Sequence, residues 1–314
     1  MRVSREERIK KCLNIKTNRN PLYFDFWRDN MPKEKLEECL FDFFINDKNE
    51  KELFHTKFEM ACSGDGQEYR KMGNIRSSSL CSLLFFYNVS EKNPIIINDI
   101  KYTKSYFEIK NRVFNNPSNM DVVLLGNSKD GEKYILFIEC KFSEYLYPSI
   151  LKISNAYREN AISNSIYEKA IENEVFNEVK DKVDIGYGYY KSNQYMEGLK
   201  QIISHYVGLH NYANRNKDSY MASEKQKEIY KEDYDHICFL EVVFKFKGEF
   251  NHEYNEYKTE SRKLTKIIKE EVKKNKDKIE YLDMKTYQDI LKVKENDNYK
   301  NNMKETIKEY YNYN

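Results

Sequence analysis

Paired cysteines are absent from this 314-residue sequence. Its cysteines are scattered, with no C-x-x-C pair among them: Cys12, Cys39, Cys62, Cys81, Cys140 and Cys238. The scatter argues against a structural zinc site, because such sites take their ligands from closely spaced cysteines and histidines. Several of these cysteines have apolar neighbours, which is typical of small buried thiols in a reducing compartment.

Long apolar runs and an excess of one charge sign are absent as well. The N-terminal segment carries charges without an apolar stretch behind them, so we expect no signal peptide. No segment has the apolar length that a bilayer requires. Lys and Arg number 53 against 51 Asp and Glu, which gives a formal net charge of +2. Any basic, nucleic-acid-binding surface must therefore be local. We expect a soluble cytoplasmic protein.

A linker is also missing, since the 5 prolines and 10 glycines form no rich stretch that divides the chain. The composition is 40% hydrophobic and 15% aromatic, enough for a packed core. We predict a single domain over 1–314, with its core at about 60–246. A helical extension over 1–59 precedes this core, and a mostly helical extension over 247–314 follows it. The polar end of the chain is expected to fray.

The middle of the chain predicts three successive strands. Alternating or apolar runs at 105–114, 120–126 and 134–142 are separated by the turn sequences NNPSN and NSKDGEK. The short connections favour antiparallel neighbours. Helical patterns cover the segment before 89, then 148–182, 191–213 and 255–278, and a further strand is expected at 235–246. The prediction is an α/β fold with a central mixed β-sheet flanked by helices. Its core order is α-β-β-β-α-β, with helical additions at both ends.

The strand YILFIECKF ends in charged residues, which cost free energy in a buried strand unless they are paired. Glu139 and Lys141 share one face because side chains alternate along a strand, and Cys140 points to the core on the other face. Asp121 lies 18 positions before Glu139, at the start of the preceding strand. A hairpin brings it close to Glu139, so two carboxylates and an ammonium converge at one edge of the sheet.

This combination of side chains suits metal-dependent phosphodiester chemistry. Two carboxylates hold Mg²⁺ and leave positions for water and a phosphate oxygen. The metal lowers the pKa of its water and neutralises charge that builds up on the phosphorus. A lysine can orient or deprotonate that water, or stabilise the pentacovalent state. An ammonium buried beside a cation would have a lowered pKa, which suits a base.

The Glu-x-Lys pattern alone has low specificity. It also occurs at Glu108/Lys110, Glu178/Lys180, Glu256/Lys258 and Glu271/Lys273. The alternative interpretation is a surface hairpin whose charges face solvent. The apolar strand around Glu139, and Asp121 on the strand before it, favour a site.

Four segments, in order, resemble bacterial members of the PD-(D/E)XK nuclease superfamily, which have the restriction-endonuclease-like fold. These are a G-x-G-x-E segment at 64–68, a serine-rich helix start at 77–79, E-x-K-F-x-E-Y at 139–145 and Q-x-x-x-H at 201–205. The resemblance covers residues 60–246. One departure is Met120, which stands before Asp121 where the family pattern has proline.

The resemblance implies roles for individual residues. Asp121 and Glu139 would bind the metal, Lys141 would be the catalytic lysine, and the backbone carbonyl of Cys140 is a candidate ligand. Glu68 would be a further ligand, although Glu59 competes for that role and a solvated glutamate at a helix start is the alternative.

Two further pairs of residues each allow two interpretations. Gln201 and His205 lie at i and i+4 of one helical face. They would contact the scissile phosphate or the attacking water, or else form the polar stripe of an amphipathic helix. Glu144 and Tyr145 either line the same site or belong to a plain loop.

The functional expectation is a Mg²⁺-dependent DNA nuclease of restriction, anti-phage defence or repair, with Mn²⁺ able to substitute. RNA is the second substrate considered, and a homodimer or a specificity partner is compatible with the fold. The alternative is a catalytically silent nuclease-fold module that binds nucleic acid or a protein. One flank of the helix at 255–278 is basic and could follow a DNA backbone, but interleaved acidic residues favour a solvated helix. The basic residues are Lys258, Arg262, Lys263, Lys266 and Lys269.

Overall fold

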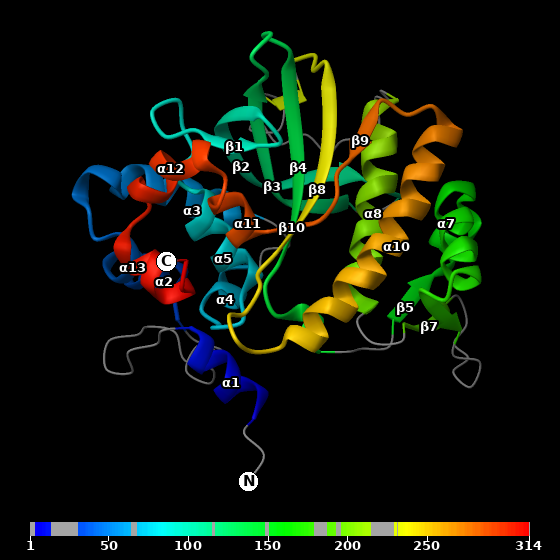
Figure 1. Ribbon diagram of the computed structural model, residues 1–314, viewed down its shortest axis with the longest axis horizontal. Helices are drawn as coiled ribbons and strands as arrows, with labels where there is room; N and C mark the ends of the chain where they lie inside the picture. The colour runs from blue at the N-terminus through cyan, green and yellow to red at the C-terminus, as the bar shows by residue number, and fades with distance from the viewer. Residues whose placement is uncertain are drawn as a thin grey trace.

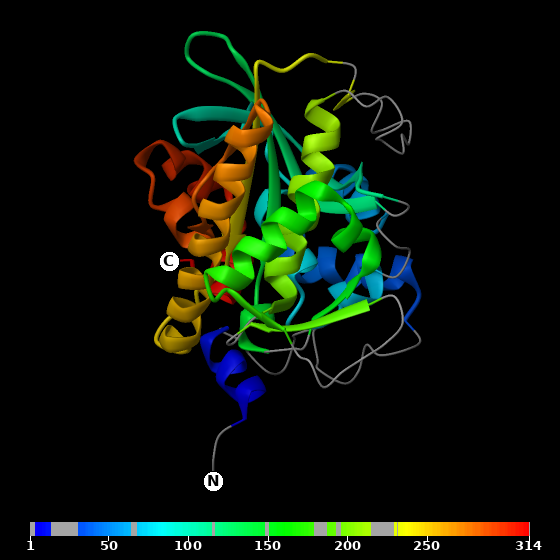
Figure 2. The same ribbon diagram turned by 90° about the vertical axis from the view of Figure 1, so that its right-hand side faces the viewer.

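The computed structural model describes most of the chain. The described residues are 4–13, 31–63, 68–114, 117–147, 151–178, 187–192, 196–214, 229–230 and 232–313. A mixed, open sheet forms the centre, and helices cover both of its faces (Figures 1 and 2). The α/β class with a helix-flanked mixed sheet is therefore confirmed. None of the helices in these ranges has the length and apolar character needed to cross a membrane.

The central sheet has the strand order β1-β2-β3-β4-β8-β10, and β9 also pairs with β8. Its strands are β1 (Ile95–Ile97), β2 (Ile100–Arg112), β3 (Pro117–Asn127), β4 (Lys133–Lys141), β8 (His236–Val243), β9 (Ile279–Tyr281) and β10 (Lys285–Thr286). Strands β1 to β4 are antiparallel neighbours, whereas β8 runs parallel to β4. The three predicted antiparallel strands and the further predicted strand are present in this part of the sheet, and the structure shows that the further strand runs parallel to β4.

The β3–β4 hairpin aligns the segments that carry the predicted site. Its ladder runs from Asn127 opposite Lys133 to Val122 opposite Ile138. The turn between the strands has Gly131 at φ +86°, a left-handed conformation that glycine adopts without steric cost. Residues 135–138 of β4 have no exposed surface, because helices cover both faces of the sheet. The buried apolar run fixes the register, since a slip by one residue would turn it to the opposite faces.

Helices from both ends of the chain cover one face of the sheet. They include α2 (Lys33–Leu40), α3 (Lys51–Ala61), α4 (Glu68–Met72), α5 (Ser78–Phe86), α11 (Tyr287–Leu291), α12 (Asp297–Asn302) and α13 (Glu305–Tyr311). The shorter α1 (Arg5–Cys12) precedes them, and Phe41–Ile45 extends α2 as a π-helical turn. Helix α5 packs against β3 and β4, and α3 packs against β2. Ser77 caps α5 by accepting from the Leu80 backbone N–H at 3.0 Å.

The other face is covered by α8 (Met196–Ala213) and α10 (Asn251–Asn275), with α7 (Ala161–Glu172) outside them. Helix α8 packs against β2 and β3 and lies in the connection between β4 and β8. This placement brings residues near 201–205 of α8 over the carboxyl end of β4. Helix α10 packs against α8 and against the short turn Glu144–Leu146 that follows β4.

Two predictions were wrong. The segment 148–182, expected to be helical, contains β5 (Leu151–Ser154), α6 (Asn155–Glu159) and β6 (Phe176–Glu178) as well as α7. These strands form a separate small sheet with β7 (Tyr187–Ser192), in the order β5-β7-β6. Short strands that pair across a helix leave little periodic pattern in the sequence.

The second wrong prediction concerns the end of the chain, which does not fray within the described residues. Tyr310, Tyr311 and Tyr313 are 3%, 2% and 4% exposed. Tyr311 packs edge-on against Phe142, directly after β4, at 5.7 Å between ring centroids. The C-terminal extension is therefore part of the core, because its tyrosines supply apolar area that the polar neighbours conceal in the sequence.

Candidate active site

Asp121 continues β3 just beyond the last paired residues of the β3–β4 ladder. Val122 is opposite Ile138, so Asp121 is directed toward Glu139. The Asp121 Oδ2 atom accepts a hydrogen bond from the Cys140 backbone N–H at 2.7 Å. The carboxylate thus takes over an N–H that the ladder no longer pairs. The Cys140 carbonyl points to the same side, because the N–H and C=O of one strand residue face the same neighbour.

Glu139 and Lys141 form a buried ion pair on the face of β4 that α8 covers. The Lys141 Nζ lies 2.5 Å from Glu139 Oε1, and the two residues are 2% and 1% exposed. From one turn of α8, Gln201 accepts a second hydrogen bond from the same ammonium. The charges at the end of this strand are thus neutralised by each other and by α8, not by solvent.

His205 connects Glu139 to a serine on β3. Its Nε2 lies 2.6 Å from Glu139 Oε2, and its Nδ1 is hydrogen-bonded to the Ser118 hydroxyl. All three side chains are at most 5% exposed. When Nε2–H donates to the carboxylate, Nδ1 accepts from Ser118, so the serine fixes the ring tautomer.

The two α8 residues differ in their surroundings. His205 is buried against the Glu139 carboxylate, so its polar group faces the strand end. Gln201 contacts the Lys141 ammonium but is itself an exposed residue of α8, so contact with the site and a place on the polar face of the helix coexist there.

The carboxylates differ in their pKa values. Burial raises the pKa of Asp121 well above its ordinary value, and the nearby charges of Glu139 and Glu108 raise it further. Burial opposes ionisation of Glu139 too, but Lys141 and His205 outweigh it and lower the pKa to about 2. Burial alone would lower the pKa of Lys141, yet the neighbouring carboxylates raise it. This is opposite to the shift expected beside a bound cation.

Glu108 is a third carboxylate of the site that sequence reasoning did not single out. It lies in β2 opposite Asp121, between the pairs Phe107–Val122 and Ile109–Met120. The residue is 7% exposed and has φ +52°, a left-handed conformation that interrupts the ladder at this position. In the sequence it belonged to one of several Glu-x-Lys pairs, so only the strand pairing distinguishes it.

Glu241 is a fourth buried carboxylate, directly beside Glu139 in the parallel β4–β8 register. It accepts hydrogen bonds from Tyr257 and, at 2.5 Å, from Ser261, both on α10. Burial raises its pKa in spite of these hydrogen bonds. The only sequence signal was a glutamate inside the apolar run CFLEVVF.

The remaining predicted residues have other positions or lie outside the description. Residues 64–67 are not among the described residues, and the Glu68 side chain also lies outside them although α4 begins there. Glu144 accepts from the backbone N–H groups of Phe142 and Ser143 at 2.7 and 2.9 Å. Tyr145 donates to the Phe244 carbonyl at 3.0 Å. Both hold the turn after β4, and Glu144 also lies within electrostatic range of Lys141, whose pKa it raises.

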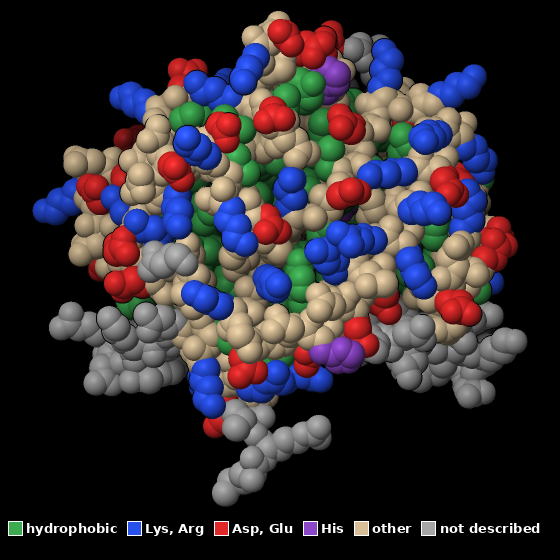
Figure 3. Space-filling model, in the orientation of Figure 1, with side chains coloured by type: hydrophobic (Ala, Val, Ile, Leu, Met, Phe, Trp, Pro, Cys, Tyr) green, Lys and Arg blue, Asp and Glu red, His purple; other side chains and the backbone are tan. Residues whose placement is uncertain are grey.

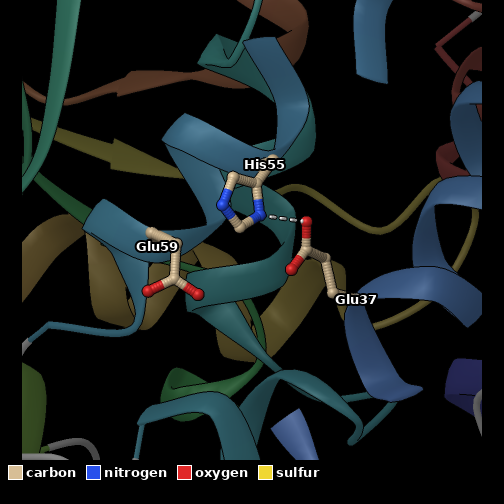
Figure 4. Close-up of side chains that lie close together, drawn as sticks. All are labelled: Glu37, His55 and Glu59. Carbon is tan, nitrogen blue, oxygen red and sulfur yellow. Dashed lines mark hydrogen bonds and ion pairs between the residues drawn. The ribbon is translucent and has the colours of Figure 1, made fainter. Parts of the chain in front are cut away.

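Glu59, the competitor of Glu68, belongs to a different cluster on α3. Figure 4 shows it beside His55 and Glu37, whose Nδ1 and Oε1 atoms lie 2.7 Å apart. Glu59 forms an ion pair with Lys33 at 2.6 Å. These groups are partly or fully exposed and already have partners, so they give no reason to extend the buried site.

The oxygens at this strand end are the candidate ligands for a hard divalent cation. Asp121 lies within electrostatic range of the Glu139 and Glu108 carboxylates, which raise its pKa, and of the Lys141 ammonium, which lowers it. The Asp121 carboxylate and the Cys140 carbonyl face the same side, and oxygen ligands of this kind suit Mg²⁺. The pKa of Asp121 is raised first by burial and then by the nearby Glu139 and Glu108 carboxylates.

Comparisons with known proteins gave no match. No protein-family model matches the chain. No curated protein and no solved structure matches it either.

Proposed function

We propose that this protein is a Mg²⁺-dependent nuclease that hydrolyses phosphodiester bonds of DNA, in restriction, anti-phage defence or repair. The observation that carries the proposal is the convergence of Asp121, Glu139 and Lys141 at the ends of two adjacent strands. Lys141 is 2% exposed, so this is a desolvated charged site and not a surface hairpin. Charged groups interact more strongly there than in water.

Each residue has a defined task in this proposal. Asp121, Glu139 and the Cys140 carbonyl would hold Mg²⁺, and Mn²⁺ would substitute. The bound ion supplies a water of lowered pKa and neutralises phosphate charge. The Lys141 ammonium donates hydrogen bonds to the attacking water or to a phosphate oxygen, and Gln201 keeps it directed toward the site. His205 holds the Glu139 carboxylate in one orientation.

The chain order supports the resemblance to the restriction-endonuclease-like core. Helix α5, strands β2, β3 and β4, helix α8 and strand β8 follow one another in the α-β-β-β-α-β order, with the small sheet inserted before α8. Fold resemblance is weaker support than the site itself, because one fold hosts many functions.

A catalytically silent module is the second candidate, and one observation favours it. Both oxygens of Glu139 already have partners, Lys141 at 2.5 Å and His205 at 2.6 Å. A metal must compete with these contacts. If it does not displace them, the site is a structural ion pair in a protein that binds nucleic acid or a partner protein.

The proposal is tested by incubating the protein with plasmid, linear single-stranded DNA and RNA, with Mg²⁺, Mn²⁺ or EDTA. We expect cleavage of DNA that needs the cation. The Asp121→Ala, Glu139→Ala and Lys141→Ala variants should each lose it by orders of magnitude. Lys129→Ala, an exposed lysine in the β3–β4 turn, is the matched control and should cleave normally.

Calorimetry with Mn²⁺ separates the two candidates. Binding that disappears in Asp121→Asn supports the nuclease. No binding that depends on Asp121 and Glu139 supports the silent module. Full activity of Lys141→Ala with Mg²⁺ would contradict the assignment of the site, and preference for RNA would change the substrate but not the chemistry.

A further inference from the structure

Helix α10 carries a line of basic residues that the active site does not use. The residues are Lys258, Arg262, Lys266, Lys269 and Lys273, separated by four, four, three and four positions. At about 3.6 residues per turn they fall within roughly 80° of one another around the helix axis. We call them the α10 basic stripe.

Acidic residues are absent from this sector of α10. With the same repeat of about 3.6 residues per turn, Glu256, Glu260 and Glu270 lie outside this sector of the helix surface. Glu271 is buried on the opposite side of the helix. The acidic and basic residues that alternate along the sequence therefore lie on different sides of the helix. The stripe is thus a solvated surface that carries one sign of charge.

The stripe is exposed and weakly neutralised. Arg262, Lys266 and Lys273 are exposed, and within the described ranges no carboxylate lies within 4.0 Å of any of them. Lys269 pairs with Asp283 at 2.7 Å, and Asp283 is also within electrostatic range of Arg262 and Lys285. In Figure 3, Lys and Arg side chains gather along the course of α10 in Figure 1.

The stripe begins close to the end of β4. The Lys258 Nζ lies 5.8 Å from the ring centroid of Tyr254, whose ring is 6.2 Å from that of Tyr145. Tyr145 is four residues after Lys141 in the chain. Tyr257 and Ser261 also anchor this part of α10 to Glu241, beside Glu139. The stripe is therefore attached rigidly to the strands of the site.

We propose that the α10 basic stripe binds the phosphate backbone of duplex DNA. From Lys258 to Lys273 the helix rises about 22 Å, and one DNA strand presents about six phosphates over that length. Successive basic residues at i and i+4 are about 6 Å apart along the axis, close to two phosphate steps of one strand. The choice of DNA over an acidic protein rests on the proposed nuclease function.

The test compares two double variants on the same helix. Lys266→Gln/Lys273→Gln neutralises the stripe, whereas Lys263→Gln/Lys274→Gln removes two other exposed lysines outside its sector. The control lysines contact Asn173 and Glu271 at 3.4 and 3.3 Å, so their loss is at least as disturbing to the fold. Fluorescence anisotropy follows binding of a labelled duplex in EDTA, where the proposed cleavage does not proceed, as the salt concentration is varied.

We expect the stripe variant to bind the duplex at least about tenfold more weakly at 0.1 M salt, with the slope of log K against log salt reduced by about 2. The control variant should keep the wild-type slope. Equal slopes for all three proteins, or equal losses in both variants, would overturn the proposal. So would displacement of DNA by polyglutamate as effectively as by unlabelled duplex. DNA bound through the stripe but left uncut in Mg²⁺ would refute the nuclease alone.

Discussion

Removing both members of the Glu139–Lys141 pair should destabilise the fold less than the two single removals added together. The two side chains are 1% and 2% exposed, and their charged atoms lie 2.5 Å apart. Loss of one partner leaves the other charge buried without its counter-ion, which costs about 3–5 kcal/mol, while replacement of both by neutral groups is often tolerated. The experiment compares the wild type with three variants: Glu139→Gln, Lys141→Met and the double variant that carries both substitutions.

The structure predicts that the two single variants differ. In Lys141→Met, Glu139 keeps its contact with His205 at 2.6 Å, so the remaining charge still has a partner. In Glu139→Gln, the Lys141 ammonium keeps Gln201 but loses its contacting carboxylate. We expect losses of about 4 kcal/mol for Glu139→Gln and about 2 kcal/mol for Lys141→Met. The double variant should lose about 3 kcal/mol, less than the sum, so the coupling energy is about 3 kcal/mol.

The lowered pKa of Glu139 gives an independent magnitude and a pH dependence. A change from 4.5 to about 2 corresponds to about 3 kcal/mol of stability. Because the folded pKa is below the unfolded one, this contribution is complete above pH 4.5 and is lost as the pH falls toward 2. The stability advantage of the wild type over Glu139→Gln should shrink across that window.

Urea unfolding followed by far-UV circular dichroism gives the four free energies of the cycle. The slope of free energy against urea should be the same in all four proteins, which shows that each unfolds from a comparable fold. Additive effects within about 0.5 kcal/mol would refute the coupled pair. A wild-type advantage that stays constant from pH 5 to pH 2 would refute the ionic origin of the stabilisation.

Four further predictions concern other groups. Ser118→Ala should lower the free energy of unfolding by about 1–2 kcal/mol, because His205 Nδ1 loses its buried partner, and denaturant unfolding measures it. Asp277→Ala should cost about 3 kcal/mol in the same assay, since its fully buried side chain accepts hydrogen bonds from Tyr206 and His210 of α8 and from Asn214 directly after α8. Burial lowers the pKa of Lys57 to about 8, so wild type should gain about 3 kcal/mol over Lys57→Met between pH 8 and 10.5, where the unfolded lysine holds more protons. EDTA should leave the protein folded, as far-UV circular dichroism would show, because Lys141 already neutralises Glu139 without a cation.

The sequence predicted the structure well where the pattern of apolar residues in a single strand was enough to identify that strand. The apolar run before Glu139 identified β4 to within a residue at each end, and alternation put Glu139 and Lys141 on one face. Asp121 could be associated with them because a short turn joins its strand to β4. These are local relations, which depend on the period of a strand and the length of a connection.

Long-range contacts could not be read in the same way. Ser118 reaches His205 across 87 positions, and Glu241 is next to Glu139 only because β8 pairs in parallel with β4. Glu108 was one of several similar Glu-x-Lys pairs until β2 aligned it with Asp121. Such residues have no distinctive neighbours in the sequence, because only the pairing of distant strands and helices brings them to the site.

The charges at the end of β4 are explained first by the protein itself. Lys141 and His205 occupy the two oxygens of Glu139, so its carboxylate is stable in the fold without an added cation. Asp121 is different, because burial, Glu139 and Glu108 all raise its pKa, while the Cys140 backbone N–H and Lys141 lower it. In the proposed nuclease, Asp121 and Glu139 would hold the cation together, which would supply a water of lowered pKa. The Lys141 ammonium, which already donates to Gln201, would lie beside that water or a phosphate oxygen, so the same ion pair that stabilises the fold would also position the catalytic lysine.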